Sequence, residues 1–397
     1  MLSFDDARER VLANVQPLGT ERLDLSLTAE RVLAEALVAT APLPPFDYSA
    51  MDGYAVRAAS FPGAGPWALK VVGEARAGVE PPVLEAGSAC RIFTGAPIPA
   101  GADAVVIQED TEPGDSGLVL FKIAPASGEN IRRRGEDLEA NAVAIAAGTR
   151  LGAHQLAVAA SLDRVSLLVA RRPRVVIVCT GDELRAPGRP GHAHSIPESN
   201  GIAVATLARS AGATAELAPL AADDASITRS AILAALGSCD LLVTVGGVSV
   251  GKHDLVRPAL ESAGAQLDFW KVRIKPGKPL VLGSAGRTRI LGLPGNPVSA
   301  QLTFALFGLP LLRALQGQSD PLPMLHEATL LGEISQRPGR LGFYRAELGP
   351  EGLTPLSNQA SGNVLSLARA NALVLVPADS TGYEPGTRVK YYRVAEL

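Results

Sequence analysis

The sequence predicts a multidomain α/β protein, in which a central doubly wound α/β domain is flanked by a β-rich domain, a helical N-terminal part and a small C-terminal β-barrel. Between residues 173 and 315, continuous apolar runs alternate with stretches of helical periodicity. This alternation is typical of a parallel sheet with helices on both faces. Residues 54–150 and 323–397 instead hold short apolar runs separated by glycine and proline, which indicates β structure.

We expect four parts in the chain, a number that suits its 397 residues. The helical N-terminal part should contain a helix capped by Ser3, a second helix over 28–38 and a third over 154–162, because apolar residues recur there at helical spacing. The expected boundaries are 1–45 plus 140–170 for the helical part, 46–139 for the β-rich domain, 171–320 for the α/β domain and 321–397 for the barrel.

Three polar, glycine-rich segments follow apolar strands of the α/β domain. They are TGDEL (180–184), GGVSVGKHD (246–254) and GLPGNP (292–297). Ligands of open α/β sheets bind beyond the carboxyl ends of the strands, so we expect these segments to form one site.

The second segment comes close to a P-loop, G-x-x-x-x-G-K-[ST]. Gly246, Gly251 and Lys252 fit this pattern, but His253 replaces the hydroxyl residue that would bind magnesium. Three interpretations remain: a true P-loop, a different anion or nucleotide cradle, and a plain turn. The second is favoured, and Asp254 beside an anion site suggests a bridging metal ion.

Acidic residues at the strand ends favour the binding of a metal ion, and a separate pair of lysines favours the binding of an oxyanion. Asp182 with Glu183, and Asp223 with Asp224, could contribute to a Mg²⁺ site, although either pair could equally cap a turn or helix. In KPGKP (275–279), two lysines flank a stiff Pro-Gly turn and can converge on a compact oxyanion. Asn296 and Pro297 open a helix, whose free N–H groups attract anions.

Charge and hydropathy argue against nucleic-acid and membrane functions. The net charge is −3, without the basic surplus of a nucleic-acid binder. The basic run IRRRGED (131–137) continues into acidic residues, so we expect a salt-bridged turn. The apolar stretch 302–312 is short for a membrane span and contains Pro310, and the first residues lack the features of a signal peptide. We therefore expect a cytoplasmic protein.

Cysteine and histidine spacing gives no metal or disulfide framework. The three cysteines are far apart and border apolar runs, so we expect buried thiols at Cys90, Cys179 and Cys239. His192 and His194 have no third ligand nearby, which makes metal binding there a weak hypothesis.

Eight motifs occur in order along nearly the full length of the chain. They are PLPPFDYSAMDGYAVR, RIFTGAPIPAGADAVVIQE, NIRRRGEDL, CTGDEL, GGVSVGKHD, IKPGKP, GLPGNPVSA and SNQASGNVLSLARANAL. Together they resemble the molybdopterin molybdenumtransferase family, whose eukaryotic relatives include the E domain of gephyrin. The resemblance implies a homodimeric enzyme whose α/β domain binds molybdopterin. It would insert molybdate into adenylylated molybdopterin and release AMP in a Mg²⁺-dependent reaction.

The resemblance also assigns roles to residues of this sequence. The residues closest to the chemistry would be Asp52, Glu183, Asp254, Lys275 and Lys278. Asp254 and Asp224 would bind the metal. The nucleotide and molybdate would contact Thr94, Asp137, Thr180, Gly181, Asp182, Gly246, Gly247, Ser249, Gly251, Pro294, Asn296, Ser299, Arg345 and Ser361. The family pattern G-G-x-S-x-G-x-x-D makes Lys252 incidental.

Asp52, Thr94 and Asp137 come from the β-rich part, and in a dimer they can complete the cleft across the interface. A transient partner would be the molybdopterin adenylyltransferase. In one departure from the family, Glu198 stands before Ser199-Asn200 where relatives often have Asp. Two other functions remain as alternatives: a scaffold that keeps the pterin site without turnover, and an adenylyltransferase acting one step earlier.

Overall fold

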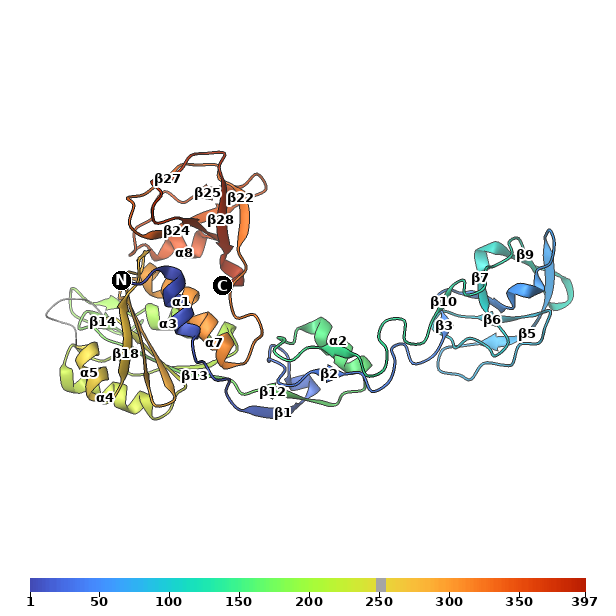
Figure 1. Cartoon of the computed structure of the whole chain (residues 1–397), viewed down its shortest axis with the longest axis horizontal. Helices are drawn as coiled ribbons and strands as arrows, with labels where there is room; N and C mark the ends of the chain where they lie inside the picture. Colours follow the sequence, from blue (N-terminus) through green and yellow to red (C-terminus); the bar gives the residue numbers. More distant parts are fainter. Residues whose placement is uncertain (248–254) are drawn as a thin grey trace. The chain divides into compact units, whose positions relative to one another are not determined.

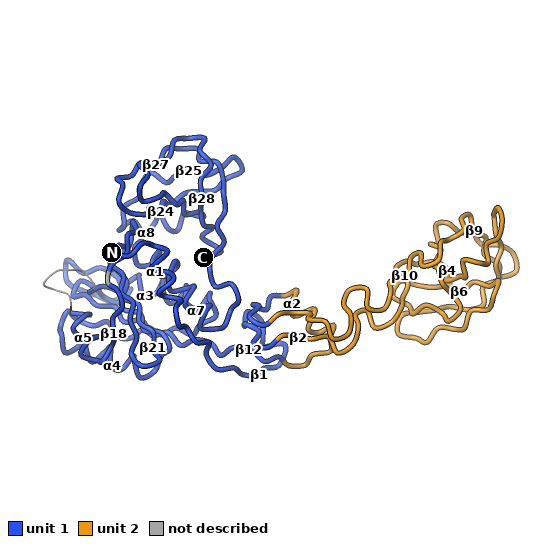
Figure 2. Tube along the Cα trace, viewed as in Figure 1, with its two compact units in different colours: residues 1–35, 147–152, 167–397 blue, residues 36–146, 153–166 orange. Residues whose placement is uncertain are grey.

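The computed structural model describes residues 1–247 and 255–397, which form two compact units (Figures 1 and 2). The first unit contains residues 1–35, 147–152 and 167–397, and the second contains 36–146 and 153–166. The α/β and C-terminal domains lie in the first unit. The β-rich domain lies in the second.

The α/β domain is built on a six-stranded sheet with the order β16-β13-β17-β21-β20-β18. Its strands are β13 (Arg174–Cys179), β16 (Thr214–Leu217), β17 (Leu241–Val245), β18 (Gln266–Lys271), β20 (Pro279–Ala285) and β21 (Thr288–Leu293). The first four strands of the order are parallel, as predicted, whereas β20 is antiparallel to both of its neighbours, β21 and β18. The predicted parallel pairing does not extend to β20, because only two residues, Gly286 and Arg287, join β20 to β21, and a parallel crossover needs a dozen or more.

Helices cover both faces of this sheet, which confirms the doubly wound architecture (Figure 1). One face packs on α1 (Phe4–Leu12), α3 (Asn200–Ser210) and the long C-terminal helix of the domain, and the other packs on α4 (Ala225–Leu236) and α5 (Val256–Ser262). The alternation along β13 shows why: Val175, Ile177 and Cys179 enter the first core, whereas Val176 and Val178 enter the second. The continuous apolar run in the sequence is therefore a strand buried on both faces.

The long helix extends from Pro297 to Leu315, as α6 (Pro297–Thr303), a π-helical stretch η5 (Phe304–Gly308) and α7 (Leu309–Leu315). It extends beyond the apolar stretch 302–312 at both ends, and its π-helical stretch ends two residues before Pro310, which lacks an N–H group. By length and composition this helix could cross a membrane, but 83% of its apolar window is buried inside the fold. It is a core helix.

The N-terminal segment is only partly helical. α1 begins as predicted, with a capping box between Ser3 and Asp6. The second predicted helix, over 28–38, is wrong: after a 3₁₀ turn η1 (Leu25–Leu27), Val32 and Leu33 pair with Arg150 and Val169, and the chain continues into β2 (Leu37–Val38). Extended pairing with distant segments overrides the local helical periodicity. Nearby elements are β1 (Thr20–Asp24) paired with β12 (Ser166–Ala170), β11 (Val143–Ile145) paired with β2, and α2 (Ala153–Ser161).

The β-rich domain of the second unit has a six-stranded sheet with the order β7-β4-β6-β5-β9-β8. Its elements are β4 (Gly53–Val56), β5 (Trp67–Ala75), β6 (Ser88–Ile92), β7 (Ala104–Ile107), β8 (Thr111–Pro113) and β9 (Leu118–Phe121), with 3₁₀ turns η2 (Ala58–Ser60), η3 (Gln108–Asp110) and η4 (Asp115–Gly117). A separate two-stranded sheet pairs β3 (Tyr48–Ser49), just before β4 in the chain, with β10 (Ile131–Arg132), the next strand after β9. The predicted turn at 131–137 is salt-bridged, since Arg132 pairs with Glu136 and Asp137.

The C-terminal domain is a curved sheet with the order β19-β24-β26-β28-β22, and β25 also pairs with β24. Its elements are β19 (Ile274–Lys275), β22 (His326–Thr329), β23 (Ile334–Ser335), β24 (Leu341–Leu348), β25 (Leu353–Pro355), α8 (Val364–Arg369), β26 (Ala372–Val376), β27 (Gly382–Tyr383), β28 (Arg388–Arg393) and η6 (Val394–Glu396). A bridge from Leu330, just after β22, to Leu353 of β25 joins the two ends of the sheet as in a small barrel. Strand β19 belongs to this sheet although it precedes β20 of the α/β domain, so the KPGKP segment lies where the two domains meet.

Candidate functional site

Three loops meet at the carboxyl ends of the parallel strands, as the sequence predicts. The loops after β13, β17 and β21 line one cavity of about 520 Å³. Its described lining residues are Cys179, Thr180, Gly181, Glu183, Leu184, Ile196, Pro197, Glu198, Ser199, Asn200, Asp223, Val245, Gly246, Gly247, Pro279, Pro294, Gly295, Asn296 and Pro297. Six predicted binding residues are thus together here: Thr180, Gly181, Gly246, Gly247, Pro294 and Asn296. Glu183, predicted to lie close to the chemistry, lines the same cavity. We call this space the strand-end cavity.

Gly246 and Gly247 allow two of these loops to approach closely. Their φ angles are +89° and +63°, a region that L side chains rarely adopt. A Cβ at Gly246 would lie 2.7 Å from the carbonyl oxygen of Thr180, and one at Gly247 would lie 2.6 Å from Cγ2 of Val256. Glycine is therefore required where β17 ends, as expected for backbone that must approach a neighbouring loop or a ligand.

Two buried oxygens of the strand-end cavity have no hydrogen-bond partner among the described residues. They are Oγ1 of Thr180 and Oδ1 of Asn200. The amide nitrogen of Asn200 donates to the carbonyl of Gly295 at 2.7 Å, which orients the side chain. Because buried polar atoms are normally paired, these two indicate a polar ligand. Asn200 was not predicted as a site residue, and its signals in the sequence are its place at the start of the helix after TGDEL and in the family segment Glu198-Ser199-Asn200.

The acidic residues at the strand ends divide into two groups. Asp182 and Asp223 lock their loops together, since the backbone N–H of Asp223 donates to Oδ1 of Asp182 at 2.9 Å. Asp224 caps α4 by accepting from the N–H groups of Ser226 and Ile227, the alternative role that the sequence left open. Asp182 lies beside the strand-end cavity without lining it, whereas Asp223 lines it.

Most titratable side chains among the described lining residues of the strand-end cavity are carboxylates. Carboxylate oxygens are the ligands that Mg²⁺ prefers. No three His, Cys, Asp or Glu residues within 1–247 and 255–397 lie close enough to hold an ion by themselves. Mg²⁺ usually keeps waters and uses one or two carboxylates plus substrate phosphates, so the residues present fit this ion. The predicted site residues Ser249, Gly251 and Asp254 lie outside the described residues.

A second cavity, of about 380 Å³, lies between the KPGKP segment and the C-terminal domain. Its described lining residues are Lys275, Pro276, Gly277, Lys278, Pro279, Asn296, Ser299, Arg340, Phe343, Tyr344, Gln359, Ala360 and Ser361. This lining includes three cationic side chains and no carboxylate. The cavity shares Pro279 and Asn296 with the strand-end cavity, so the two adjoin. We call it the lysine cavity.

The lysine cavity brings together four residues that the sequence assigned to oxyanion binding: Lys275, Lys278, Ser299 and Ser361. The parallel pairing of β19 with β24 fixes the backbone of Lys275, whose Nζ lies 5.8 Å from the centre of the Tyr344 ring. Lysine ammonium groups and serine hydroxyls supply the charge and the donors that a tetrahedral dianion needs.

Arg345, also assigned to oxyanion binding, does not line the lysine cavity. It is fully buried, and its Nη2 donates to the carbonyls of Asn358 and Ala360, so it supports the loop that carries Ser361. Burial lowers the pKa of its guanidinium. The cavity is instead lined by Arg340, in the turn before β24. Sequence reasoning missed Arg340 because the resemblance pointed to the arginine of GFYR.

The β-rich domain holds the remaining predicted residues. Oδ1 of Asp52 accepts from the backbone N–H of Thr94 at 2.7 Å and from its hydroxyl at 2.8 Å. These two bonds hold the pKa of the Asp52 carboxyl below its ordinary value, backbone donation being the larger cause. Asp137 pairs with Arg132 at 2.5 Å. Asp52 and Thr94 are thus brought together, and Asp137 is part of the salt-bridged turn.

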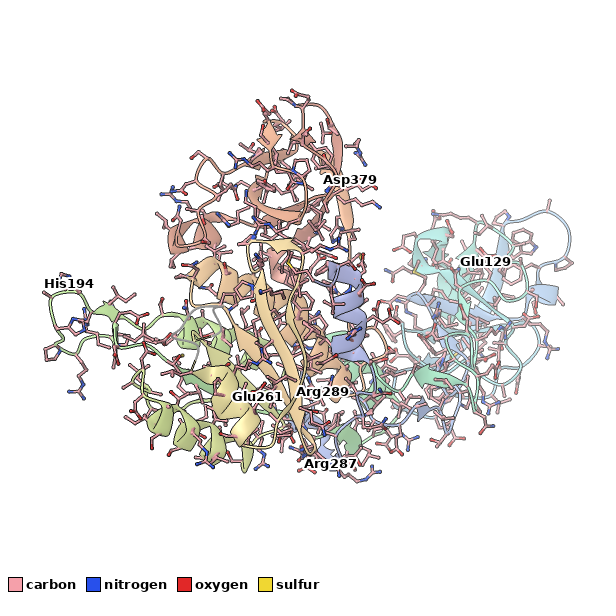
Figure 3. The ribbon with its side chains drawn as sticks, turned by 60° about the vertical axis from the view of Figure 1, so that its left-hand side comes forward. Glu129, His194, Glu261, Arg287, Arg289 and Asp379 are labelled. Carbon is pink, nitrogen blue, oxygen red and sulfur yellow. The ribbon has the colours of Figure 1, made fainter. Side chains whose placement is uncertain are left out.

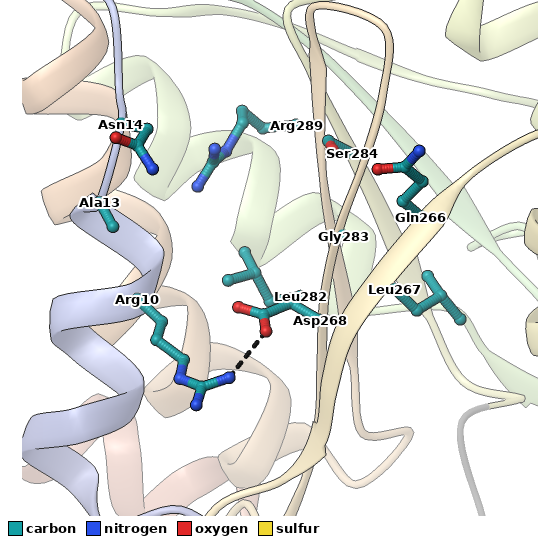
Figure 4. A pocket seen from close by; sticks show the side chains of 10 residues that line it. All are labelled: Arg10, Ala13, Asn14, Gln266, Leu267, Asp268, Leu282, Gly283, Ser284 and Arg289. Atoms are coloured by element: carbon teal, nitrogen blue, oxygen red, sulfur yellow. Dashed lines mark hydrogen bonds and ion pairs between the residues drawn. The ribbon is translucent and has the colours of Figure 1, made fainter.

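Two other features lie apart from these cavities. A cavity of about 480 Å³ lies between α1 and the strands β18 and β20, and an ion pair between Arg10 and Asp268 at 2.8 Å crosses it. Figure 4 shows the side chains that line it. Its lining shares no residue with the strand-end or lysine cavities. His194 lies near the tip of the exposed loop between β14 (Leu184–Arg185) and β15 (Ile196–Pro197), as Figure 3 shows.

Three family models match the chain in order. They are the MoeA N-terminal region (domain I and II) over residues 2–162, the "probable molybdopterin binding domain" over 176–314, and the MoeA C-terminal region (domain IV) over 327–394. The molybdopterin molybdenumtransferase of Haemophilus influenzae is 35% identical to this chain and covers 98% of both chains. The chain belongs to the molybdopterin molybdenumtransferase family.

Other family members agree over similar lengths. Molybdopterin molybdenumtransferase 2 of Mycobacterium tuberculosis is 37% identical over 91% of this chain and 92% of its own. The crystal structure of the molybdopterin biosynthesis moeA protein from Pyrococcus horikoshii superposes with a TM-score of 0.86 at 29% identity, covering 99% of this chain and 100% of that one. As a molybdopterin molybdenumtransferase family member, the chain is a transferase with a role in molybdenum cofactor biosynthesis.

Proposed function

We propose that the enzyme inserts molybdate into adenylylated molybdopterin and releases AMP in a Mg²⁺-dependent reaction. The observation that carries the proposal is the contact between two cavities of different chemistry. A glycine-lined cavity at the strand ends adjoins a cationic cavity free of carboxylates among its described lining residues, and the two share Pro279 and Asn296. A pterin nucleotide in the first cavity would therefore have its dithiolene within reach of molybdate in the second.

The strand-end cavity would bind the pterin nucleotide. Gly246 and Gly247 let backbone N–H groups approach its phosphates without a side chain in the way. Oγ1 of Thr180 and Oδ1 of Asn200 would gain the hydrogen-bond partners that they lack in the described structure. Glu183, which lines the same space, is the carboxylate that we place closest to the reacting phosphates.

The lysine cavity would bind molybdate. Lys275 and Lys278 would balance the charge of the dianion, and the hydroxyls of Ser299 and Ser361 would donate to its oxygens. We add Arg340 to this set because it lines the cavity. Arg345 would act indirectly, by supporting the loop of Ser361.

Magnesium would be held by Asp254 with the help of a neighbouring carboxylate. Asp223 suits this role better than Asp224, because Asp223 lines the strand-end cavity while Asp224 caps α4. When bound, the ion supplies positive charge against the phosphates of the nucleotide. The chain's own contribution is to orient the nucleotide on the glycine-rich loops and to line the lysine cavity with cationic side chains.

We also propose a homodimer in the cytoplasm, with the β-rich domain at the interface. Phe46 and Met51, close to Asp52 in the chain, are large apolar side chains exposed at 46% and 48%. In a dimer, Asp52 and Thr94 of one protomer could complete the site of the other. The substrate would come from a molybdopterin adenylyltransferase through transient contact, since adenylylated molybdopterin is that reaction's product.

Purified enzyme incubated with adenylylated molybdopterin should release AMP only when both molybdate and Mg²⁺ are present. Asp254→Ala should abolish this release, and Lys252→Ala, the matched control two residues away, should keep most of it. Equal loss in both variants would contradict the proposed role of the loop. No molybdate-dependent AMP release by the wild type would contradict the proposed function.

A further inference from the structure

A buried carboxylate stands in the wall of the strand-end cavity. Glu198 lines the cavity although only 5% of its surface is exposed. Burying a carboxylate is costly unless hydrogen bonds compensate. Its Oε1 accepts from the backbone N–H of Gly201 at 2.6 Å, at the positive end of α3. This one bond leaves most of the hydrogen-bonding capacity of the carboxylate for other groups.

The thiol of Cys179 faces the other oxygen of this carboxylate. Cys179 is the last residue of β13, is 2% exposed and lines the same cavity. The two groups meet over Gly201: a Cβ there would lie 2.7 Å from Sγ of Cys179 and 3.1 Å from Oε2 of Glu198. Only glycine at this position leaves room for the thiol and the carboxylate together.

The surroundings keep this thiol protonated. Burial raises the pKa of Cys179 far above its ordinary value, and the charge of Glu198 and a hydrogen bond to it raise the pKa further. A protonated thiol is a donor, whereas a thiolate would be a second buried anion. The same thiol is therefore a poor nucleophile and a suitable partner for a carboxylate.

We propose that Cys179 is a positioning residue of the enzyme: its thiol donates to Oε2 of Glu198 and fixes the carboxylate in the wall of the strand-end cavity, where it accepts hydrogen bonds from the bound nucleotide. This inference rests on the proposed function, since it assigns the nucleotide to that cavity. Thr180 and Asn200 line the same cavity, and each has a buried oxygen without a partner among the described residues. The fixed carboxylate would be a third hydrogen-bonding group for the nucleotide there.

A purely structural explanation makes a different prediction. In that case Glu198 only caps α3 and Cys179 only fills the core, so replacement of either would change stability and leave turnover of the folded enzyme alone. Cys239 provides the matched control, because it is also a buried thiol, 6% exposed, but packs in the core on the opposite face of the sheet.

The test compares Cys179→Ser, Cys179→Ala and Cys239→Ala by kcat/KM for adenylylated molybdopterin and by KM for molybdate. Cys179→Ala should lower kcat/KM for the nucleotide about 10-fold or more, the scale of one hydrogen bond to a charged group. It should leave the KM for molybdate unchanged. Cys179→Ser keeps a donor and should retain most activity, and Cys239→Ala should match the wild type. Equal losses in Cys179→Ser and Cys179→Ala would overturn the proposal.

A double-mutant cycle with Glu198→Gln separates positioning from packing. If Cys179 acts through the carboxylate, Cys179→Ala should cause almost no further loss in the Glu198→Gln background. Additive losses would contradict the inference. Thermal melting of each variant provides the folding check, in which Cys179→Ala and Cys239→Ala should unfold at similar temperatures.

The outcome remains informative if the proposed function fails. Should the wild type release no AMP, the same cycle is measured by calorimetric binding of adenylylated molybdopterin. Non-additive losses of affinity would then support the role of Cys179 without turnover, and additive losses or unchanged affinity would refute it.

Discussion

Replacing Gly246 by alanine tests whether the close approach of two loops builds the strand-end cavity. Gly246 has a φ of +89°, and a Cβ there would lie 2.7 Å from the carbonyl oxygen of Thr180. The left-handed backbone costs an alanine roughly 1–2 kcal/mol, and pressing a methyl group against backbone adds about 1–3 kcal/mol. Gly246→Ala should therefore lower the free energy of unfolding by about 2–5 kcal/mol, the sum of these two costs.

Gly264 provides the matched control for this substitution. Its φ is +82°, nearly the same, but a Cβ there would meet nothing within 4 Å. Gly264→Ala should therefore carry only the backbone cost of about 1–2 kcal/mol and keep its activity. Denaturant unfolding gives the stabilities, and AMP release at a temperature where both variants are folded gives the activities. If Gly246→Ala is as active and as stable as Gly264→Ala, the close approach has no role and the reasoning is wrong.

Two further predictions concern the lysine cavity and the β-rich domain. Lys278→Ala should raise the KM for molybdate by about 10-fold or more, the scale of a lost charge-assisted hydrogen bond, whereas Lys390→Ala, an exposed lysine of the C-terminal domain, should leave it unchanged. Steady-state kinetics at varied molybdate decides this, and equal KM values would exclude Lys278 from the site. Thr94→Val keeps the backbone N–H donor but removes the hydroxyl, so the pKa of Asp52 should rise towards its ordinary value. The Asp52 carboxylate of the wild type should accordingly stay ionised to lower pH than that of the variant, which NMR titration would detect, and identical titration curves would contradict the assigned hydrogen bond.

The location of the site could be predicted from the sequence because it follows from topology. The apolar run of β13 predicts a strand buried on both faces, and the polar residues after it must lie at its carboxyl end. Parallel neighbours place their own carboxyl ends at the same edge, so Thr180, Gly246 and Pro294 meet although they are far apart in the sequence. The alternation of strands and helices in the sequence was therefore enough to predict where the site lies.

The errors arise where distant contacts decide the local structure. Val32 and Leu33 fit a helical pattern, yet they pair with Arg150 and Val169, more than a hundred residues away. The spacing of apolar residues along the chain contains no information about such partners. The same holds for β20, which pairs antiparallel with both β21 and β18.

The choice between Arg340 and Arg345 depends on the direction of side chains. Arg345 lies within β24, and its guanidinium is enclosed behind the loop that carries Ser361. Arg340 lies in the preceding turn and reaches the lysine cavity. The sequence shows two arginines five residues apart, and only the packing of the C-terminal sheet against the loop tells which one faces the cavity.

The central claim is that molybdate insertion and AMP release are one reaction at adjoining cavities. A single-turnover experiment tests it most directly, with enzyme in excess of adenylylated molybdopterin and with Mg²⁺ and molybdate added together. The account predicts one AMP released for each molybdenum inserted, at equal rates, with both products lost when molybdate is omitted. AMP release at an unchanged rate without molybdate, or molybdenum insertion without AMP release, would contradict it.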